Sequence, residues 1–184
     1  MRTKSTLEKA VKFVSNCKYI FSFKKNIFQK NTFFILLFLL TANVFSQTEN
    51  VDLYIANLEN SGQIARRDQL KHLLYGLQSA VYSSPNGEIK VYGEKPTALF
   101  SSIQSINTLN LSAHSKKDIQ IVTIKIDSTS DLNQSIDLNA FSDFENLKYI
   151  FIISQVPTTA SVINNLIKND SSKYTLMYKI SIGG

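Results

Sequence analysis

The sequence LKYIFII, residues 147–153, decides the fold. It is rich in β-branched and aromatic residues, which favour a strand. Because strand side chains point alternately to opposite faces, Tyr149 and Phe151 are expected on one face and Ile150 and Ile152 on the other. Both faces are then apolar, and we expect this strand to be central in a sheet that is covered on both sides.

Two further runs of this composition lie at residues 119–126 and 174–182, and a helical apolar pattern occurs at residues 160–167. Three positions within the runs follow one another at intervals of 28 residues: Val122, Ile150 and Tyr178. Alternation of strand and helix predicts an α/β fold, with a small, mostly parallel sheet backed by helices. Antiparallel pairing of the run at residues 119–126 with the run at residues 147–153 would contradict a repeated arrangement.

The segment before these runs has a different pattern. Apolar residues recur at helical spacing over residues 47–60 and 63–82, and Ser61-Gly62 interrupts them, so we expect two N-terminal helices. The sequence SPNG at residues 84–87 predicts a turn, and residues 88–92 read as a short strand.

An apolar pattern occurs twice, at residues 100–111 and 141–152, and both copies begin with Phe-Ser. Its spacing changes from three to two, which predicts a short helical segment that turns directly into a strand. This pattern resembles the leucine-rich repeat, L-x-x-L-x-x-L-x-L-x-x-N, over roughly residues 98–182, with His114 and Gln155 where that family has asparagine. The resemblance implies a solenoid of parallel strands. A small α/β domain with ordinary amphipathic segments is the alternative.

The apolar run FFILLFLL, residues 33–40, follows a basic segment and precedes small residues that end at Ser46. This layout is typical of a bacterial secretory signal peptide, here with an extended basic region, cleaved before Gln47. The run is shorter than the ~20 residues that span a bilayer. We therefore expect an exported protein, located in the periplasm, on the cell surface or outside the cell; an uncleaved interfacial anchor is the alternative.

Charge is distributed unevenly along the chain. The full sequence has 20 Lys and Arg against 14 Asp and Glu, but eight of the bases and one of the acids lie in residues 1–46. Residues 47–184, the expected single α/β domain, then carry 12 bases and 13 acids, which argues against binding to nucleic acid. The one cysteine, Cys17, is also in the expected leader, so the domain has no disulfide. We expect residues 47–84 of this domain to be helical and residues 85–184 to form strand–helix–strand units.

Catalytic motifs are missing from the sequence, which has no H-E-x-x-H, no G-x-S-x-G and no glycine-rich phosphate loop. The two histidines, His72 and His114, are not tied by spacing to a carboxylate or a nucleophile. Residues 127–133 place oxygen-bearing side chains at alternate positions, as calcium loops do, but Leu132 replaces the required glycine, so we expect a solvated loop. Catalytic residues therefore stay unknown, and we expect no metal and no cofactor.

These observations favour a non-enzymatic protein of the bacterial envelope or exterior that binds another protein or an envelope polymer. Membrane contact is expected only through the leader. The alternative is a small periplasmic enzyme or ligand-binding domain with an unrecognised site, and a purely structural domain is a third reading. A deep polar pocket joining a histidine to Asp118 or Asp127 would favour the enzyme, whereas a flat apolar or aromatic patch would favour the binding protein.

Overall fold

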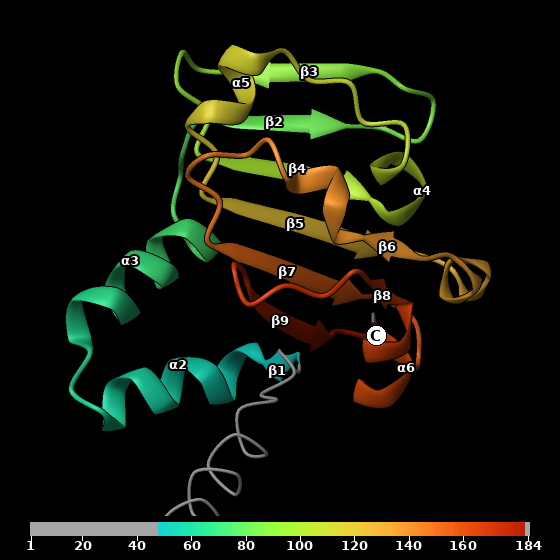
Figure 1. Ribbon diagram of the computed structural model, residues 1–184. Coiled ribbons are helices and arrows are strands. Elements are labelled where there is room, and N and C mark those ends of the chain that lie inside the picture. Colours follow the sequence, from blue (N-terminus) through green and yellow to red (C-terminus); the bar gives the residue numbers. More distant parts are fainter. Residues whose placement is uncertain (1–47, 183–184) are drawn as a thin grey trace, which may run out of the picture. The chain divides into compact units, whose positions relative to one another are not determined.

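The computed structural model describes residues 48–182 of the chain, and Figure 1 shows how their helices and strands are arranged. The signal peptide expected over residues 1–46 lies outside the described residues. Within these described residues, seven strands form the main sheet and two short strands form a second one. The strands of the main sheet are β1 (Glu49–Asn50), β2 (Ala80–Ser83), β3 (Ile89–Tyr92), β4 (Ala98–Ser102), β5 (Ile121–Ile126), β7 (Tyr149–Ser154) and β9 (Thr175–Ile180). Those of the second are β6 (Ile136–Asp137) and β8 (Ile167–Lys168).

Strand order in the main sheet is β1-β9-β7-β5-β4-β2-β3. All neighbours are parallel, except that β3 pairs antiparallel with β2. The predicted α/β fold with a mostly parallel sheet is therefore confirmed. The strands β2, β4, β5, β7 and β9 lie side by side in the order in which they occur along the chain, so each connection moves the chain one strand further across the sheet.

Helices lie on both faces of this sheet. The first two are α2 (Val51–Asn60) and α3 (Ile64–Tyr75). The connections between the parallel strands contain α4 (Ile103–Ile106), α5 (Ala113–Lys117), the 3₁₀ helices η1 (Thr129–Asn133) and η2 (Leu138–Phe141), and α6 (Ala160–Leu166). Figure 1 shows several of these connections in front of the sheet, with α2 and α3 to the lower left.

Two hydrophobic cores result, one on each face of the sheet. On what we call the connection face, strand residues such as Val122 and Ile150 pack with residues of the connections, among them Phe141. On the N-terminal-helix face, strand residues such as Ile121 pack with Leu70 and other residues of α2 and α3. Alternation of side chains along each strand separates the two sets.

The central position predicted for residues 147–153 is confirmed. β7 lies between β5 and β9, and both of its faces are covered. Tyr149 and Phe151 are buried on the N-terminal-helix face, and Ile150 and Ile152 on the connection face. Burial of such large apolar side chains contributes ~2 kcal/mol each, so this strand anchors both cores.

The helix expected over residues 63–82 is too long. α3 ends at Tyr75, because Gly76 adopts an extended conformation with φ −78° and ψ 155°. The chain then enters β2, where Val81 pairs with Leu99 of β4 and is fully buried. The apolar residues continue at helical spacing beyond Tyr75, but pairing of β2 with β4 stabilises a strand there instead of a helix. The region expected to be helical, residues 47–84, therefore ends in a strand.

The two copies of the apolar pattern do not adopt the same structure, so the predicted internal repeat is wrong. The copy at residues 141–152 runs from the end of η2 through a turn into β7, as expected. The copy at residues 100–111 begins in β4, passes through α4 and ends outside any strand. The 28-residue interval also fails after β7: Ile150 pairs with Val122 on one side but with Leu176, not Tyr178, on the other.

Candidate functional site

The residues that could have formed a catalytic centre lie on separate elements. His72 is exposed on α3, and His114 belongs to α5. Asp118 follows α5, and Asp127 follows β5. Within residues 48–182, no group of three or more His, Cys, Asp or Glu side chains is placed to hold a metal ion.

The oxygen-rich segment 127–133 forms a turn around a buried carboxylate, so the expected solvated loop is only partly correct. Asp131 accepts hydrogen bonds from the N–H groups of Asp127 and Ser128, both at 3.0 Å, and from Nε2 of Gln104 at 2.8 Å. Burial alone would raise the pKa of Asp131, but these hydrogen bonds and one from the Ser128 side chain lower it below its usual value. The carboxylate thus caps η1 instead of facing a ligand.

Arg66 and Arg67, an adjacent basic pair on α3, connect this helix to its neighbours. Arg67 forms an ion pair of 3.1 Å with Glu59 of α2. The Arg66 guanidinium lies 5.9 Å from the centre of the Tyr54 ring and donates a 3.5 Å hydrogen bond to the Tyr149 hydroxyl, which raises the pKa of Arg66. Both arginines therefore have structural partners.

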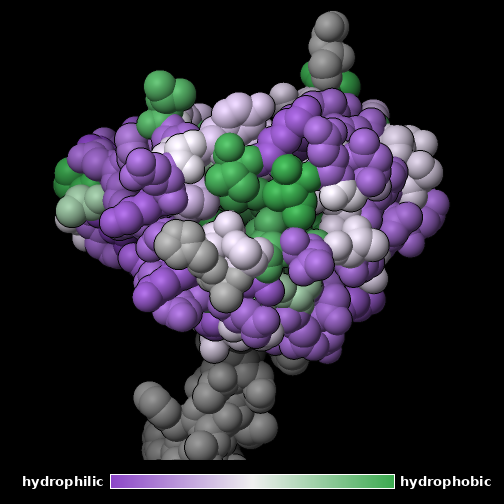
Figure 2. Space-filling model, turned by 90° about the horizontal axis from the view of Figure 1, so that it is seen from above, coloured by the Kyte–Doolittle hydropathy of each residue, from purple (hydrophilic) through white to green (hydrophobic). Residues whose placement is uncertain are grey.

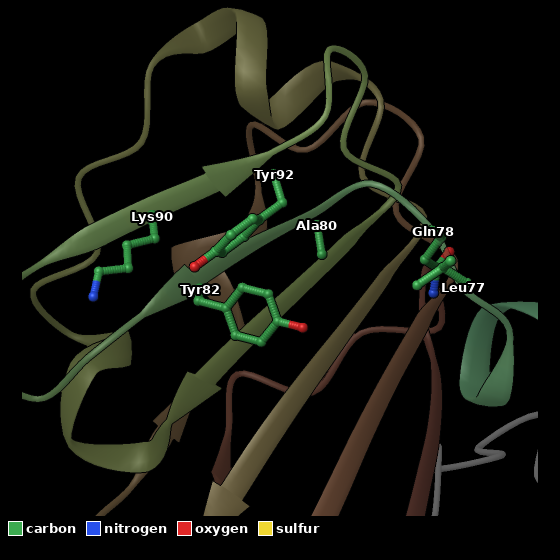
Figure 3. Close-up of a pocket in the computed structure, with 6 residues that line it drawn as sticks. All are labelled: Leu77, Gln78, Ala80, Tyr82, Lys90 and Tyr92. Atoms are coloured by element: carbon green, nitrogen blue, oxygen red, sulfur yellow. The ribbon is translucent and has the colours of Figure 1, made fainter.

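A hollow of about 490 Å³ lies beside β2 and β3, on the N-terminal-helix face. Figure 3 shows the residues that line it: Leu77, Gln78, Ala80, Tyr82, Lys90 and Tyr92. We call this the tyrosine hollow. Tyr82 and Tyr92 are 44% and 57% exposed, and Leu77 is fully exposed, so large apolar groups are open to solvent here.

The hollow arises from a difference in side-chain size between neighbouring positions of the sheet. Ala80 lies opposite Ala98 on β4 and opposite Tyr92 on β3, so only the small side chain of Ala80 lines the hollow at this position of β2. The next row on this face contains the rings of Tyr82 and Phe100, which stack at 4.9 Å, and Tyr82 also meets Tyr92 of the Ala80 row edge-on at 5.5 Å. Such ring pairs are geometrically favourable, so the tyrosines are held in place.

Polar groups fix the rim of the hollow. The Gln78 side chain donates to the Leu73 carbonyl at 2.6 Å and accepts from the Thr97 hydroxyl at 2.7 Å, which ties the end of α3 to the sheet. Across the hollow, Lys90 forms an exposed 3.2 Å ion pair with Glu88. Exposed pairs of this kind contribute ~0–1 kcal/mol, so Lys90 remains free to pair with another acid.

The β2–β3 hairpin is defined by two glycines with positive φ. The predicted turn at residues 84–87 is confirmed: Ser84 and Glu88 are joined by a 2.9 Å hydrogen bond from N–H to carbonyl, and Gly87 has φ 82°. At the other end of β3, Gly93 has φ 84°, and a Cβ there would collide with the Ser79 side chain. The backbone of the hairpin therefore requires both glycines.

β3 is an edge strand with exposed apolar residues. Ile89 and Val91 are 36% and 50% exposed, and they point to the connection face, opposite to Lys90 and Tyr92. Figure 2 looks down on this side of the molecule and shows apolar side chains gathered within a mostly hydrophilic surface. Apolar groups are thus accessible on both sides of β3.

The hollow and the edge position of β3 were not predicted from the sequence. Most residues of β2 fall within the helix expected over residues 63–82. A signal was present: AVYS and IKVY flank the turn at residues 84–87, which is the pattern of a β-hairpin. Only the second of these two segments was expected to be a strand.

Comparison with protein-family models, with curated proteins and with solved structures finds no match to this chain. No helix within residues 48–182 is long and apolar enough to cross a membrane. Function is therefore inferred from the surface chemistry of the described residues.

Proposed function

We propose that this chain is an exported, non-enzymatic module of the bacterial envelope or exterior that binds another protein at the tyrosine hollow. The observation that carries the proposal is the group of exposed apolar side chains around the hollow, Leu77, Tyr82 and Tyr92. Tyrosines are enriched in protein interfaces because they bury a large area and lose little conformational entropy. Residues 47–184 are nearly neutral, which favours a protein partner over nucleic acid.

Export is proposed from the sequence of residues 1–46, whose basic segment and short apolar run are typical of a signal peptide. Cleavage before Gln47 would release a domain without cysteine. An intact mass of the exported product that begins at Gln47 is the expected result. Full-length chain retained in the cytosol would contradict export.

The proposed likeness to leucine-rich repeats is limited to the order of the strands in the sheet. Strands of a solenoid follow one another in chain order, as β2, β4, β5, β7 and β9 do. The two motif copies do not support the closer likeness, because residues 109–111 are not in a strand whereas residues 150–152 are. We therefore propose a sheet of consecutive parallel strands in which the binding surface lies at the edge beside β2, on the antiparallel strand β3.

A second candidate function is the binding of a small molecule. The volume of the hollow, about 490 Å³, is within the range of roughly 300–1,000 Å³ found for ligand sites. Against this candidate, the two tyrosines on the rim are about half exposed and Leu77 is fully exposed, so the hollow is open to solvent and would enclose little of a small ligand. Protein binding uses such an open aromatic surface better than a small ligand does.

Photo-cross-linking in the producing cells tests protein binding. A photoreactive amino acid is placed at Leu77, on the rim of the hollow, or at Leu53, a matched position on α2 that is 61% exposed. The proposal expects a discrete protein adduct from position 77 that is lost when Tyr92→Ala is added, and no such adduct from position 53. No adduct at 77, or the same adducts at both positions, would contradict it.

A further inference from the structure

The outer edge of β3 has backbone groups available for another strand. Among residues 48–182, β3 pairs with β2 alone. In an antiparallel ladder, hydrogen-bonded pairs alternate with pairs that exchange no backbone hydrogen bond. Because Ser84 donates to Glu88, these two residues form a hydrogen-bonded pair, and so do Tyr82–Lys90 and Ala80–Tyr92. The N–H and C=O groups of Ile89 and Val91 therefore point outward.

The side chains around this edge alternate in a way that an added strand can match. Ile89 and Val91 present apolar groups to one face, and Lys90 and Tyr92 present a cation and a ring to the other. Opposite residues of an antiparallel pair lie on the same face, about 5 Å apart, and interact directly. A complementary strand thus needs apolar residues opposite Ile89 and Val91 and an acid opposite Lys90.

A second copy of this chain does not fit this edge well. Antiparallel self-pairing that uses all outward groups places Ile89 opposite Val91 of the other copy, and this register puts Lys90 directly opposite Lys90. Like charges in that position are destabilising, and edge lysines commonly prevent sheets from joining. The charge of Lys90 therefore selects against self-association and in favour of an acidic strand.

We propose that β3 binds an extended segment of another protein as an eighth, antiparallel strand, with an Asp or Glu of that segment opposite Lys90 and apolar residues on either side. This inference rests on the proposed protein-binding function and names the mode of binding. The residue of the added strand two positions from its acid points to the same face as Lys90. Its side chain would lie opposite Tyr92, at the mouth of the tyrosine hollow. Main-chain hydrogen bonds supply affinity in this mode, and side chains supply specificity.

Synthetic peptides test strand addition on the purified protein. The probe is a capped peptide with the sequence Thr-Val-Glu-Val-Thr, and its matched control has Lys in place of Glu. Saturable binding of the Glu peptide should slow hydrogen exchange at the amides of Ile89 and Val91 at least tenfold, because these N–H groups become bonded. The Lys peptide should bind about three- to tenfold more weakly, with a difference that shrinks as salt rises.

Two changes remove the backbone contact separately. Val91→Pro deletes one outward N–H without removing a bond to β2, and proline is tolerated on an edge strand. A peptide that is N-methylated at the backbone amides expected to donate to β3 tests the same contact without altering the protein. This peptide gives a result even if the proline variant is unstable. Each change is expected to abolish binding. Unchanged binding of the N-methylated peptide would overturn strand addition.

The outcomes separate this inference from the function on which it rests. Peptide binding that leaves the amides of Ile89 and Val91 unprotected but is lost in Tyr92→Ala would overturn strand addition while supporting the hollow as a binding site. Protection of the same amides that rises with protein concentration, without peptide, would assign the edge to a second copy and also overturn the inference. Absence of a cross-linked adduct at Leu77 would instead contradict the proposed function.

Discussion

Gly93 shows how one residue holds the candidate surface in shape. Its φ of 84° lies in the left-handed region, and its backbone approaches the Ser79 side chain so closely that a Cβ would collide. Both features keep the end of β3 against the start of β2, where Tyr92 turns toward the hollow. A side chain at this position must therefore disturb the binding surface as well as the fold.

Gly93→Ala is expected to lower the free energy of unfolding by about 3 kcal/mol, from backbone strain together with overpacking. Gly62→Ala is the matched control, because Gly62 also has a positive φ, 73°, but open space around the new Cβ. That variant should lose only about 1 kcal/mol. Chemical denaturation of both variants gives the comparison, and equal losses would show that the contact with Ser79 does not matter.

Asp131 gives a pH-dependent contribution to stability. Its pKa is lowered in the folded chain by hydrogen bonds from Gln104, Ser128 and Asp127, although burial acts in the opposite direction. A group with a lowered folded pKa stabilises the fold above its unfolded pKa, and this stabilisation is lost as the pH falls through the folded value. The effect is therefore complete at neutral pH and disappears in acid.

Asp131→Asn should cost about 1–3 kcal/mol of unfolding free energy at pH 7, because the backbone N–H groups then donate to a neutral amide oxygen instead of a carboxylate, and the new NH2 group faces the Gln104 amide donor. The difference from the unsubstituted chain should shrink below about pH 4, the ordinary range of an aspartate. Denaturation curves over pH 2.5–7 measure it. A difference that stays constant over this range would mean that Asp131 does not act through its charge.

At the scale of elements, the central strand β7 was predicted correctly, whereas β2, the first strand of the edge hairpin, was missed. β7 could be predicted because the alternation of Tyr149, Ile150 and Phe151 is local and apolar on both faces. The end of α3 could not, because apolar residues continue at helical spacing to Val81, and only pairing of β2 with β4 decides otherwise. The tyrosine hollow depends on that same pairing and was missed with it.

The cap of η1 illustrates the same limit. Oxygen-bearing side chains at residues 127–133 predict a loop, but burial of Asp131 requires Gln104, which lies 27 positions earlier in the chain. Likewise, the 28-residue interval gives the correct register of β5 with β7, but β9 pairs two residues earlier than the interval requires. Sequence patterns thus identified β5, β7 and β9, and tertiary contacts set the register between them.

The difference between a central and an edge strand can be measured with matched isoleucines. Ile150→Ala in β7 removes fully buried volume and should cost about 2–5 kcal/mol. Ile89→Ala in β3, where the side chain is 36% exposed, should cost about 1 kcal/mol or less. Similar losses in chemical denaturation would contradict the strand order and would place β3 inside the sheet.

At the scale of the whole molecule, the chain combines an expected signal peptide with a candidate binding surface. Residues 1–46 carry all of the excess positive charge, and the nearly neutral remainder contains a sheet whose edge strand β3 exposes apolar side chains. Large exposed apolar groups are commonly sites of interaction, and this edge combines them with unpaired backbone groups. Export and protein binding are therefore two parts of one proposal, and a single experiment can address both.

That experiment is thiol labelling in intact cells, with one cysteine introduced in the expected mature domain, which has none of its own. Leu77→Cys reports on the hollow and Leu53→Cys on a matched exposed position away from it. With a reagent that does not enter the cytosol, the account predicts that position 53 reacts in cells as fast as in purified protein, whereas position 77 reacts at least several-fold more slowly in cells. Labelling of neither position until the cells are broken would contradict export, and equal unhindered labelling of both would contradict protein binding at the tyrosine hollow.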